Sequence, residues 1–107
     1  DYTLACWNGQ DELVPVAKAY SGLTDVELKA MDQWIRKHTI QKFGPVRQVE
    51  PLQVFEIGFE GIAASTRHKS GIALRFPRIL RWRQDVGPND ADGLAHFHAL
   101  MTNHHAL

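Results

Sequence analysis

Apolar and polar residues alternate at every second position in several short stretches of this chain. Over residues 54–61 one parity is apolar, with Phe55, Ile57 and Phe59. The other parity is mostly charged residues or glycine. Successive side chains on a β-strand point to opposite faces, so this period of two is typical of a half-buried strand. The alternation predicts a strand over residues 54–61 in a mainly β protein.

The same alternation returns in two stretches that Pro77 separates. In residues 72–76 one parity is apolar, with Ile72, Leu74 and Phe76. Arg75 has the other parity, so its guanidinium group is expected to point outward. Pro77 has no N–H to donate, so residues 78–83 are predicted to form a separate or bent strand. On that strand one face is expected to hold Arg78, Leu80 and Trp82, and the other Ile79, Arg81 and Arg83.

A hairpin is predicted at the N-terminus. Residues 2–7 and 12–19 read as strands, and the turn dipeptide Asn8-Gly9 follows the first of them. Pro15 cannot donate to a central ladder, so part of the second strand is expected at an edge or a bulge.

A helix is predicted to begin after this hairpin. Thr24-Asp25-Val26-Glu27 is a capping box, in which the threonine hydroxyl accepts from the glutamate N–H and the glutamate side chain reaches back. An apolar stripe follows at helical spacing, formed by Leu28, Met31 and Ile35, with Phe43 as its expected end. The pair Gly44-Pro45 is expected to stop this helix.

A second helix is predicted in the C-terminal tail. Asn89-Asp90 are suitable caps, and apolar residues recur at helical spacing at Leu94, Phe97 and Met101. Histidines crowd the same tail, at His96, His98, His104 and His105. No acidic or cysteine ligand completes a site with them, so a polar helix is favoured over a metal site, and no metal ligand is predicted.

These elements favour one small barrel domain. The 107 residues fit a single domain, and a chain of this size buries roughly two-thirds of its unfolded surface. About five short strands with one helix between them are typical of an OB-fold, a five-stranded Greek-key barrel. We expect the OB-fold in residues 1–88 and the helical tail in residues 89–107. A generic α+β sandwich remains the alternative.

Cysteine content and hydropathy narrow the class further. Cys6 is the single cysteine, so no internal disulfide can form. No apolar run approaches the roughly 20 residues that span a bilayer. A cytoplasmic protein without a membrane partner is therefore expected. The chain opens without Met and directly in a strand, which indicates a piece of a longer polypeptide.

Half of the fixed positive charge is concentrated in one segment. The chain has a formal net charge of +0, with 12 Lys and Arg residues. Six of these lie in residues 67–83, with no acidic residue among them: Arg67, Lys69, Arg75, Arg78, Arg81 and Arg83. Arginine offers a planar fork that grips phosphate with two bonds. Phosphate or nucleic-acid contact is therefore favoured over a solvated basic face. Glu56 and Glu60 share one strand face, and a solvated face or salt bridges to this segment are favoured for them over an acid pair.

Residues 71–85 read GIALRFPRILRWRQD. This segment resembles the last signature motif, motif VI, of ATP-dependent DNA ligases. Residues 16–23, 54–57 and 67–71 also resemble that family's C-terminal OB domain, in the same order. The resemblance covers residues 2–85 and is closest to bacterial repair-type ligases, which implies a role at the nucleoid within the cytoplasm.

The resemblance implies ligation in three steps. A lysine of an upstream nucleotidyltransferase domain takes AMP from ATP, with Mg²⁺ present in the full-length enzyme. The AMP passes to the 5′-phosphate of a nick in double-stranded DNA, and the 3′-hydroxyl displaces it. The nucleophile motif K-x-D-G is absent from this chain. By this resemblance, the domain alone is inactive and holds no cofactor.

The resemblance also implies residue roles. Arg75, Arg78 and Arg83 match positions that contact the ATP phosphates. Arg83 and Asp85 match an R-x-D-K ending that orients the triphosphate, an accessory catalytic role, although Val86 stands where the family usually has lysine. The expected DNA contacts are Arg67, Lys69, Arg75 and Arg81.

Two alternatives remain open on the sequence. The first alternative is a stand-alone OB-fold module that binds single-stranded nucleic acid. The other alternative is the OB domain of an RNA ligase or an mRNA capping enzyme, which share the R-x-D-K ending.

Overall fold

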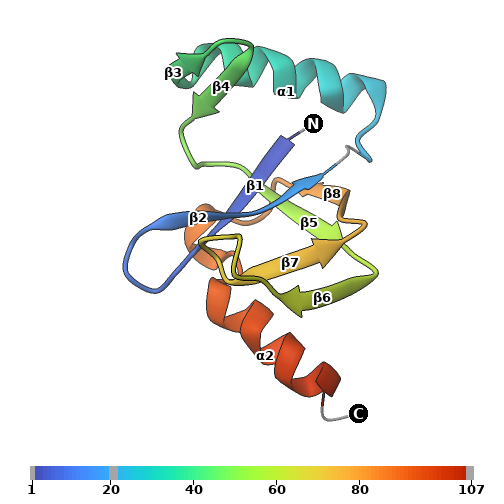
Figure 1. Cartoon of the computed structure of the whole chain (residues 1–107). Helices are drawn as coiled ribbons and strands as arrows, with labels where there is room; N and C mark the ends of the chain where they lie inside the picture. The colour runs from blue at the N-terminus through green and yellow to red at the C-terminus, as the bar shows by residue number, and fades with distance from the viewer. Residues whose placement is uncertain (1, 20–21, 106–107) are drawn as a thin grey trace.

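Strands make up most of the computed structural model, which describes residues 2–19 and 22–105, with side chains as far as residue 101. The elements in chain order are β1 (Tyr2–Trp7), β2 (Leu13–Ala19), α1 (Asp25–Lys37), β3 (Thr39–Phe43), β4 (Val46–Val49), β5 (Val54–Gly58), β6 (Gly61–Ala64), β7 (Ile72–Arg75), β8 (Arg78–Arg83), a 3₁₀ turn (Pro88–Asp90) and α2 (Leu94–His105) (Figure 1). The mainly β class predicted from the alternation is confirmed.

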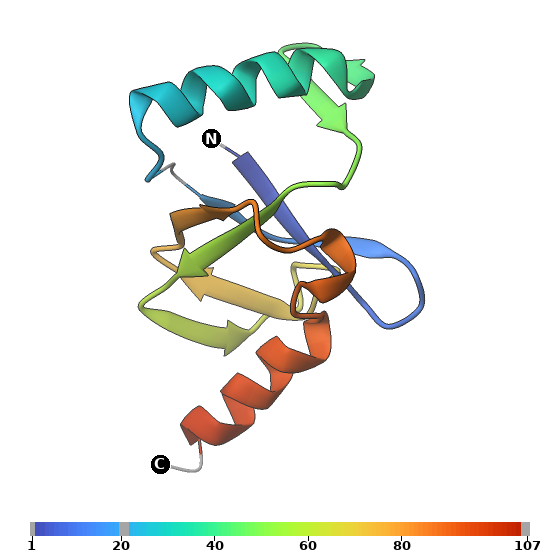
Figure 2. The ribbon, with the colours of Figure 1, turned by 180° about the vertical axis from the view of Figure 1, so that it is seen from behind.

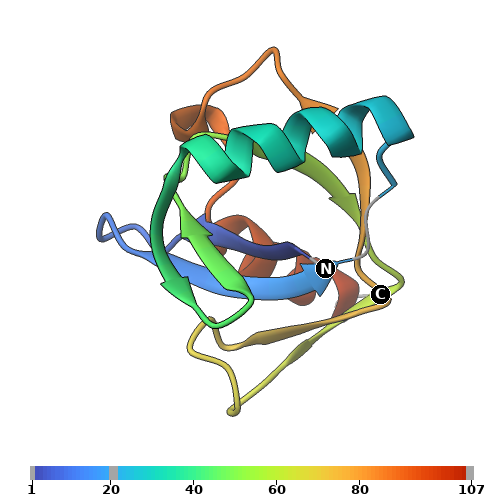
Figure 3. The same cartoon turned by 90° about the horizontal axis from the view of Figure 1, so that it is seen from above.

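The described strands form four antiparallel pairs. Hydrogen bonds join β1 to β2, β3 to β4, β5 to β8 and β6 to β7. Viewed from above, the strands curve around a shared interior (Figure 3). Helices α1 and α2 lie at opposite ends of the molecule (Figures 1 and 2). The chain therefore forms more strands than the five expected, and the OB-fold itself stays a prediction.

Two clusters of buried side chains form the core. One contains Cys6, Val16, Ile72 and Phe97, and the other contains Ala19, Leu23 and Ile79. Phe97 comes from α2, and Leu94 and Met101 of the same helix pack against the first cluster. The predicted tail helix is therefore confirmed, and its apolar stripe covers the strands. The division of the chain at residue 88 stays a prediction.

The N-terminal hairpin matches its prediction. β1 and β2 pair antiparallel, with a register shift between Leu4 and Ala5 where Ala5 faces Pro15. Pro15 is exposed at this irregularity. Proline has no N–H to donate, so it is tolerated at a bulge where it would interrupt a regular ladder. Tyr20 and Ser21, within the segment that resembles the ligases, lie outside the described residues.

Helix α1 begins as predicted and ends earlier. Thr24 accepts from the N–H of Glu27, and the Glu27 side chain accepts from the N–H of Thr24. The predicted extension to Phe43 is wrong, because the helix ends at Lys37 and β3 follows at once. Thr39 and Ile40 are β-branched and favour a strand. Gly44, at φ +61°, makes the turn to β4 instead of stopping a helix.

The strand predicted over residues 54–61 is two strands. β5 ends at Gly58, and β6 begins at Gly61 after a bend at Glu60. The expected inward face is nonetheless confirmed, because Phe55 and Ile57 pack on one buried cluster and Phe59 on the other.

The faces predicted for residues 78–83 are wrong because β8 contains a bulge. Glu56 of β5 faces Arg81, and the next residue, Ile57, faces Ile79, so Leu80 has no partner. An unpaired residue shifts the side-chain alternation. Ile79 is therefore buried, Leu80 is exposed, and Trp82 packs on the same cluster as Ile79.

Phe76 was predicted to face inward, and it is 70% exposed. Its φ of +53° lies in the left-handed region, which is uncommon for a residue other than glycine. The residue before a proline is disfavoured in the right-handed helical region. That rule favours extended backbone and does not account for the left-handed conformation, which turns the chain between β7 and β8 and leaves the ring in solvent.

Gly22 sits where the chain between β2 and α1 passes β8. A Cβ atom at residue 22 would overlap the backbone carbonyl oxygen of Ile79, which is buried. We expect Gly22→Ala to lower the free energy of unfolding by about 1–3 kcal/mol or more, because overpacking forces the backbone to move. Urea denaturation followed by tryptophan fluorescence measures this loss.

Gly87→Ala is the matched control. A Cβ at residue 87 would lie 3.8 Å from the Asp90 side chain, an ordinary contact. Equal stability of the Gly22 and Gly87 variants would contradict the close approach to Ile79.

Candidate phosphate-binding site

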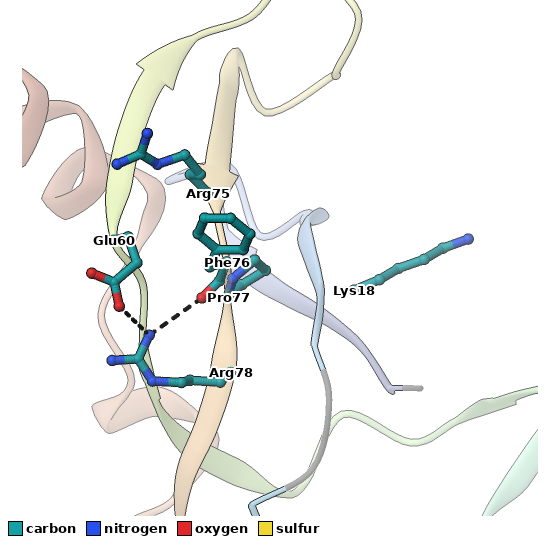
Figure 4. A pocket seen from close by; sticks show the side chains of 6 residues that line it. All are labelled: Lys18, Glu60, Arg75, Phe76, Pro77 and Arg78. Atoms are coloured by element: carbon teal, nitrogen blue, oxygen red, sulfur yellow. Dashed lines mark hydrogen bonds and ion pairs between the residues drawn. The ribbon is translucent and has the colours of Figure 1, made fainter.

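The turn between β7 and β8 forms one wall of an open hollow of about 900 Å³. The residues that line it come from three parts of the chain (Figure 4): Lys18, Glu60, Arg75, Phe76, Pro77 and Arg78. Arg75 ends β7 and Arg78 begins β8, so only Phe76 and Pro77 lie between them. The tight turn thus brings two of the predicted site arginines to one hollow.

Arg75 extends across the neighbouring strand. It faces Gly61 of β6, and its Nε lies 3.6 Å from the point that a Cβ on residue 61 would occupy. Its guanidinium carbon lies 5.8 Å from the centre of the Phe76 ring, within the range of a cation–π contact. Among the described residues Arg75 forms no ion pair. It therefore presents an available charge beside an exposed aromatic ring.

Arg78 is held by its neighbours at the same hollow. Its Nη1 donates to Oε1 of Glu60 at 3.2 Å and to the Phe76 carbonyl at 3.4 Å (Figure 4). Glu60 lies in the bend after β5, and its own N–H donates to the Arg75 carbonyl at 2.8 Å. Of the two arrangements expected for Glu60, the structure shows the salt bridge to the basic segment, and this bridge joins two residues that line the hollow.

A second group of charges surrounds Glu56 on β5. Arg81 donates from Nη2 to Oε1 of Glu56 at 3.3 Å, and Nη1 of Arg83 lies 3.7 Å from the same oxygen. The bulge at Leu80 creates this group, because it turns Arg81 outward opposite Glu56. For Glu56, too, the structure shows the salt bridges rather than a face that only solvent contacts.

Arg83 also grips Asp85 with two bonds. Its Nε donates to Oδ1 and its Nη2 donates to Oδ2, both at 2.8 Å. The side-chain hydrogen bonds from Arg83 lower the pKa of Asp85 to about 2, and Asp85 raises the pKa of Arg83. The Arg83 side chain is 28% exposed, so it remains partly open to solvent. Arg83 and Asp85 thus act as one preformed unit.

Arg67 and Lys69 lie apart from the hollow, in the loop between β6 and β7. Lys69 donates to Oε2 of Glu12 in the N-terminal hairpin at 2.9 Å. Arg67 is exposed and forms no ion pair among the described residues. The predicted site residues therefore form three groups: one at the hollow, one around Glu56 and one in this loop.

Sequence reasoning missed Lys18 as a residue of the hollow. It is the single charged residue within β2, and that position among apolar neighbours is the signal that could have indicated it. Phe76 was expected in the core, and no sequence pattern indicated its left-handed conformation.

The part of the chain that the structure describes contains no group of three or more His, Cys, Asp or Glu residues arranged to hold a metal ion. Its helices are also too short or too polar for any of them to span a membrane. The side chains of His104 and His105 lie outside those described.

Comparison with known protein families identifies one family that matches most of the chain. The family described as "ATP dependent DNA ligase C terminal region" matches residues 1–86. This chain belongs to that family. The relatives include a probable DNA ligase of Koribacter versatilis, 53% identical over 94 residues, and one of Opitutus terrae, 47% identical over 97 residues. A DNA ligase of Natronomonas pharaonis is 42% identical over 84 residues.

The chain is short beside these ligase relatives. The alignments cover 88%, 89% and 78% of the chain but 16%, 10% and 15% of the relatives. The resemblance read from motif VI is thereby confirmed at the level of the family. The family match ends at Val86, directly after the Arg83–Asp85 unit, so most of the C-terminal tail lies outside it.

The pairing with Arg83 leads us to expect that the Asp85 carboxyl group titrates at unusually low pH. Because the native pKa of Asp85 is about 2, below its ordinary value of 3.8, the pair contributes stability at neutral pH. That contribution is lost as the pH falls from about 4 to about 2. We expect NMR detection of the Asp85 carboxyl carbon to give a midpoint near pH 2.

In Arg83→Ala the Asp85 midpoint should rise toward 3.8, its ordinary value. Lys29→Ala, on exposed α1, is the control and should leave the midpoint unchanged. If the midpoint of Asp85 is the same in Arg83→Ala as in the wild type, the two side chains are not paired in solution.

Proposed function

We propose that this chain is the C-terminal OB domain of an ATP-dependent enzyme that seals nicks in duplex DNA, and that its task is to grip phosphates. Membership of the DNA ligase family supports the reaction class. The observation that carries the proposal is the β7–β8 turn, which holds Arg75 and Arg78 at one open hollow beside the exposed ring of Phe76. Two guanidinium groups at one hollow suit an anionic backbone or a polyphosphate.

In the proposed mechanism the domain acts on two kinds of phosphate. During self-adenylation Arg75, Arg78 and Arg83 contact the ATP phosphates, where positive charge offsets the charge that develops on the leaving pyrophosphate. Asp85 orients Arg83 for this step through its two hydrogen bonds of 2.8 Å. In the sealing steps Arg67, Lys69, Arg75 and Arg81 contact the backbone of nicked double-stranded DNA.

Acidic neighbours hold four of the six basic side chains before any phosphate arrives. Arg78 pairs with Glu60, Arg81 and Arg83 with Glu56, and Lys69 with Glu12. These pairs are partly exposed, and exposed pairs contribute only about 0–1 kcal/mol. A phosphate therefore displaces the carboxylates at little cost, and the carboxylates keep the arginines extended until then.

The remaining machinery belongs to the longer protein in this proposal. The nucleophilic lysine comes from an upstream nucleotidyltransferase domain, since the chain has no K-x-D-G. Magnesium accompanies the ATP phosphates there. In this proposal the domain contributes cationic side chains to that site.

A single-strand-binding module is the second candidate. The exposed ring of Phe76 next to Arg75 favours it, because aromatic rings stack on unpaired bases. Family membership favours the ligase over this module, and over the OB domain of an RNA ligase or a capping enzyme.

Duplex binding tests the first role. We expect Arg75→Ala in the 107-residue chain to weaken binding to a nicked duplex and to reduce the slope of log K against log salt by about 1, the value for one phosphate contact. Fluorescence anisotropy over a salt series gives both quantities. Lys29→Ala, which removes another exposed cation, on α1, is the matched control and should leave the slope unchanged.

The same assay separates the candidates. Tighter binding to a single strand or to RNA than to the nicked duplex would contradict the ligase assignment. A wild-type salt slope near zero would contradict phosphate contact altogether.

Catalysis by the longer protein tests the second role. We expect Arg83→Ala to slow self-adenylation more than it slows the sealing of a nick that is already adenylated, because Arg83 is assigned to the triphosphate. Transfer of labelled AMP to protein measures the first step, and gel analysis of pre-adenylated DNA measures the second. Equal slowing of both steps would refute the assignment, and the 107-residue chain alone should acquire no label.

A further inference from the structure

The β3–β4 ribbon carries two positive charges directly opposite each other. Lys42 pairs with Arg47 across the two strands, next to the turn-closing pair of Phe43 and Val46. Side chains in opposed positions lie on the same face with Cβ atoms roughly 4.5–5.5 Å apart, and like charges there are destabilising. In β5–β8, by contrast, Glu56 lies opposite Arg81, an attractive pair. The β3–β4 ribbon thus places like charges opposite each other where β5–β8 places opposite ones.

Nothing in the described part of the chain neutralises this pair. Both side chains are exposed, and neither forms an ion pair with a described residue. Glu50, which follows β4, forms no ion pair with either of them among the described residues. Lys37, at the end of α1 beside the ribbon, is exposed and adds a third cation without an ion pair there. These cations are therefore unpaired within the described residues and open to an external anion.

The ribbon is also built to project. Gly44, at φ +61°, and Pro45 make a two-residue turn between β3 and β4, and proline fixes one of its dihedral angles. Phe43 and Val46 beside the turn are 54% and 60% exposed, so the tip of the ribbon is not packed into the core. Two-stranded ribbons of this kind fit the major groove of B-DNA, which is about 12 Å wide.

We propose that the Lys42–Arg47 face of the β3–β4 ribbon is a second binding site for the phosphate backbone of duplex DNA, separate from the hollow at the β7–β8 turn. The site rests on the proposed function, because the nicked duplex supplies the anion. Figures 1 and 3 show the ribbon and the β7–β8 turn on different sides of the molecule. The two surfaces therefore contact the duplex at separate places and can be removed one at a time.

Removing the pair tests the site. K42A/R47A in the 107-residue chain should weaken binding to a labelled nicked duplex and reduce the salt slope by about 2, since each phosphate contact contributes about 0.9. The loss should be about tenfold larger at 50 mM than at 200 mM salt, which follows from that slope. K29A/R36A removes the same charge from exposed positions of α1 and should reduce the slope by less than half as much.

A single charge reversal separates binding from stability. K42E places a carboxylate opposite Arg47, so it should raise the melting temperature while it weakens duplex binding. A merely structural role for Lys42 would give the opposite coupling, with affinity following stability.

Three results would overturn the ribbon site, and they differ in what they imply for the proposed function. An unchanged affinity and slope in K42A/R47A, with Arg75→Ala still weakening binding, would overturn the ribbon site and leave the proposed function standing. A wild-type chain that fails to bind nicked duplex would overturn both. A loss in K42A/R47A no larger than in K29A/R36A would show general charge attraction and also overturn the site; the acidic surface of another protein would then be the remaining counter-charge.

Discussion

The antiparallel pairing of β5 with β8, with its single unpaired residue, controls the rest of the structure. The bulge at Leu80 lets Ile79 and Trp82 both pack on one buried cluster. The Trp82 indole N–H donates to Gln53 at 2.9 Å, which fixes the strand end. Without the bulge, strict alternation with Ile79 buried would bury Arg81 and expose Trp82, and an unpaired buried charge is costly. The core and the charged face are therefore set by the same irregularity.

The charged face is arranged by pairing before any ligand binds. Glu56, Glu60 and Asp85 each accept from an arginine of β8, and all of these pairs lie at least partly in solvent. Such pairs contribute little to stability, yet they restrict long side chains that would otherwise sample many rotamers. A proposed ligand phosphate then meets arginines whose conformational freedom is already reduced, which lowers the entropy cost of binding.

Sequence patterns predicted the elements with strong local signals and failed where tertiary contacts compete. The capping box at Thr24 marked the start of α1, and the Asn8-Gly9 turn marked the first hairpin. The β3–β4 hairpin was missed, because the pair Gly44-Pro45 is compatible with either the end of a helix or a turn between strands. The basic segment of residues 67–83 was found as a candidate site, but its separation into three groups and the position of Lys18 at the hollow follow from chain folding.

The sequence by itself determined the class of the protein, since alternation specifies strands and the segment from Arg75 to Asp85 specifies the family. Only the tertiary structure decided which side chains are available. Pro77 forces a turn whose conformation at Phe76 depends on how β7 meets β8, and a bulge depends on the partner strand. Local propensity reports the period of a strand, but it carries no information about a residue inserted to satisfy packing against another strand.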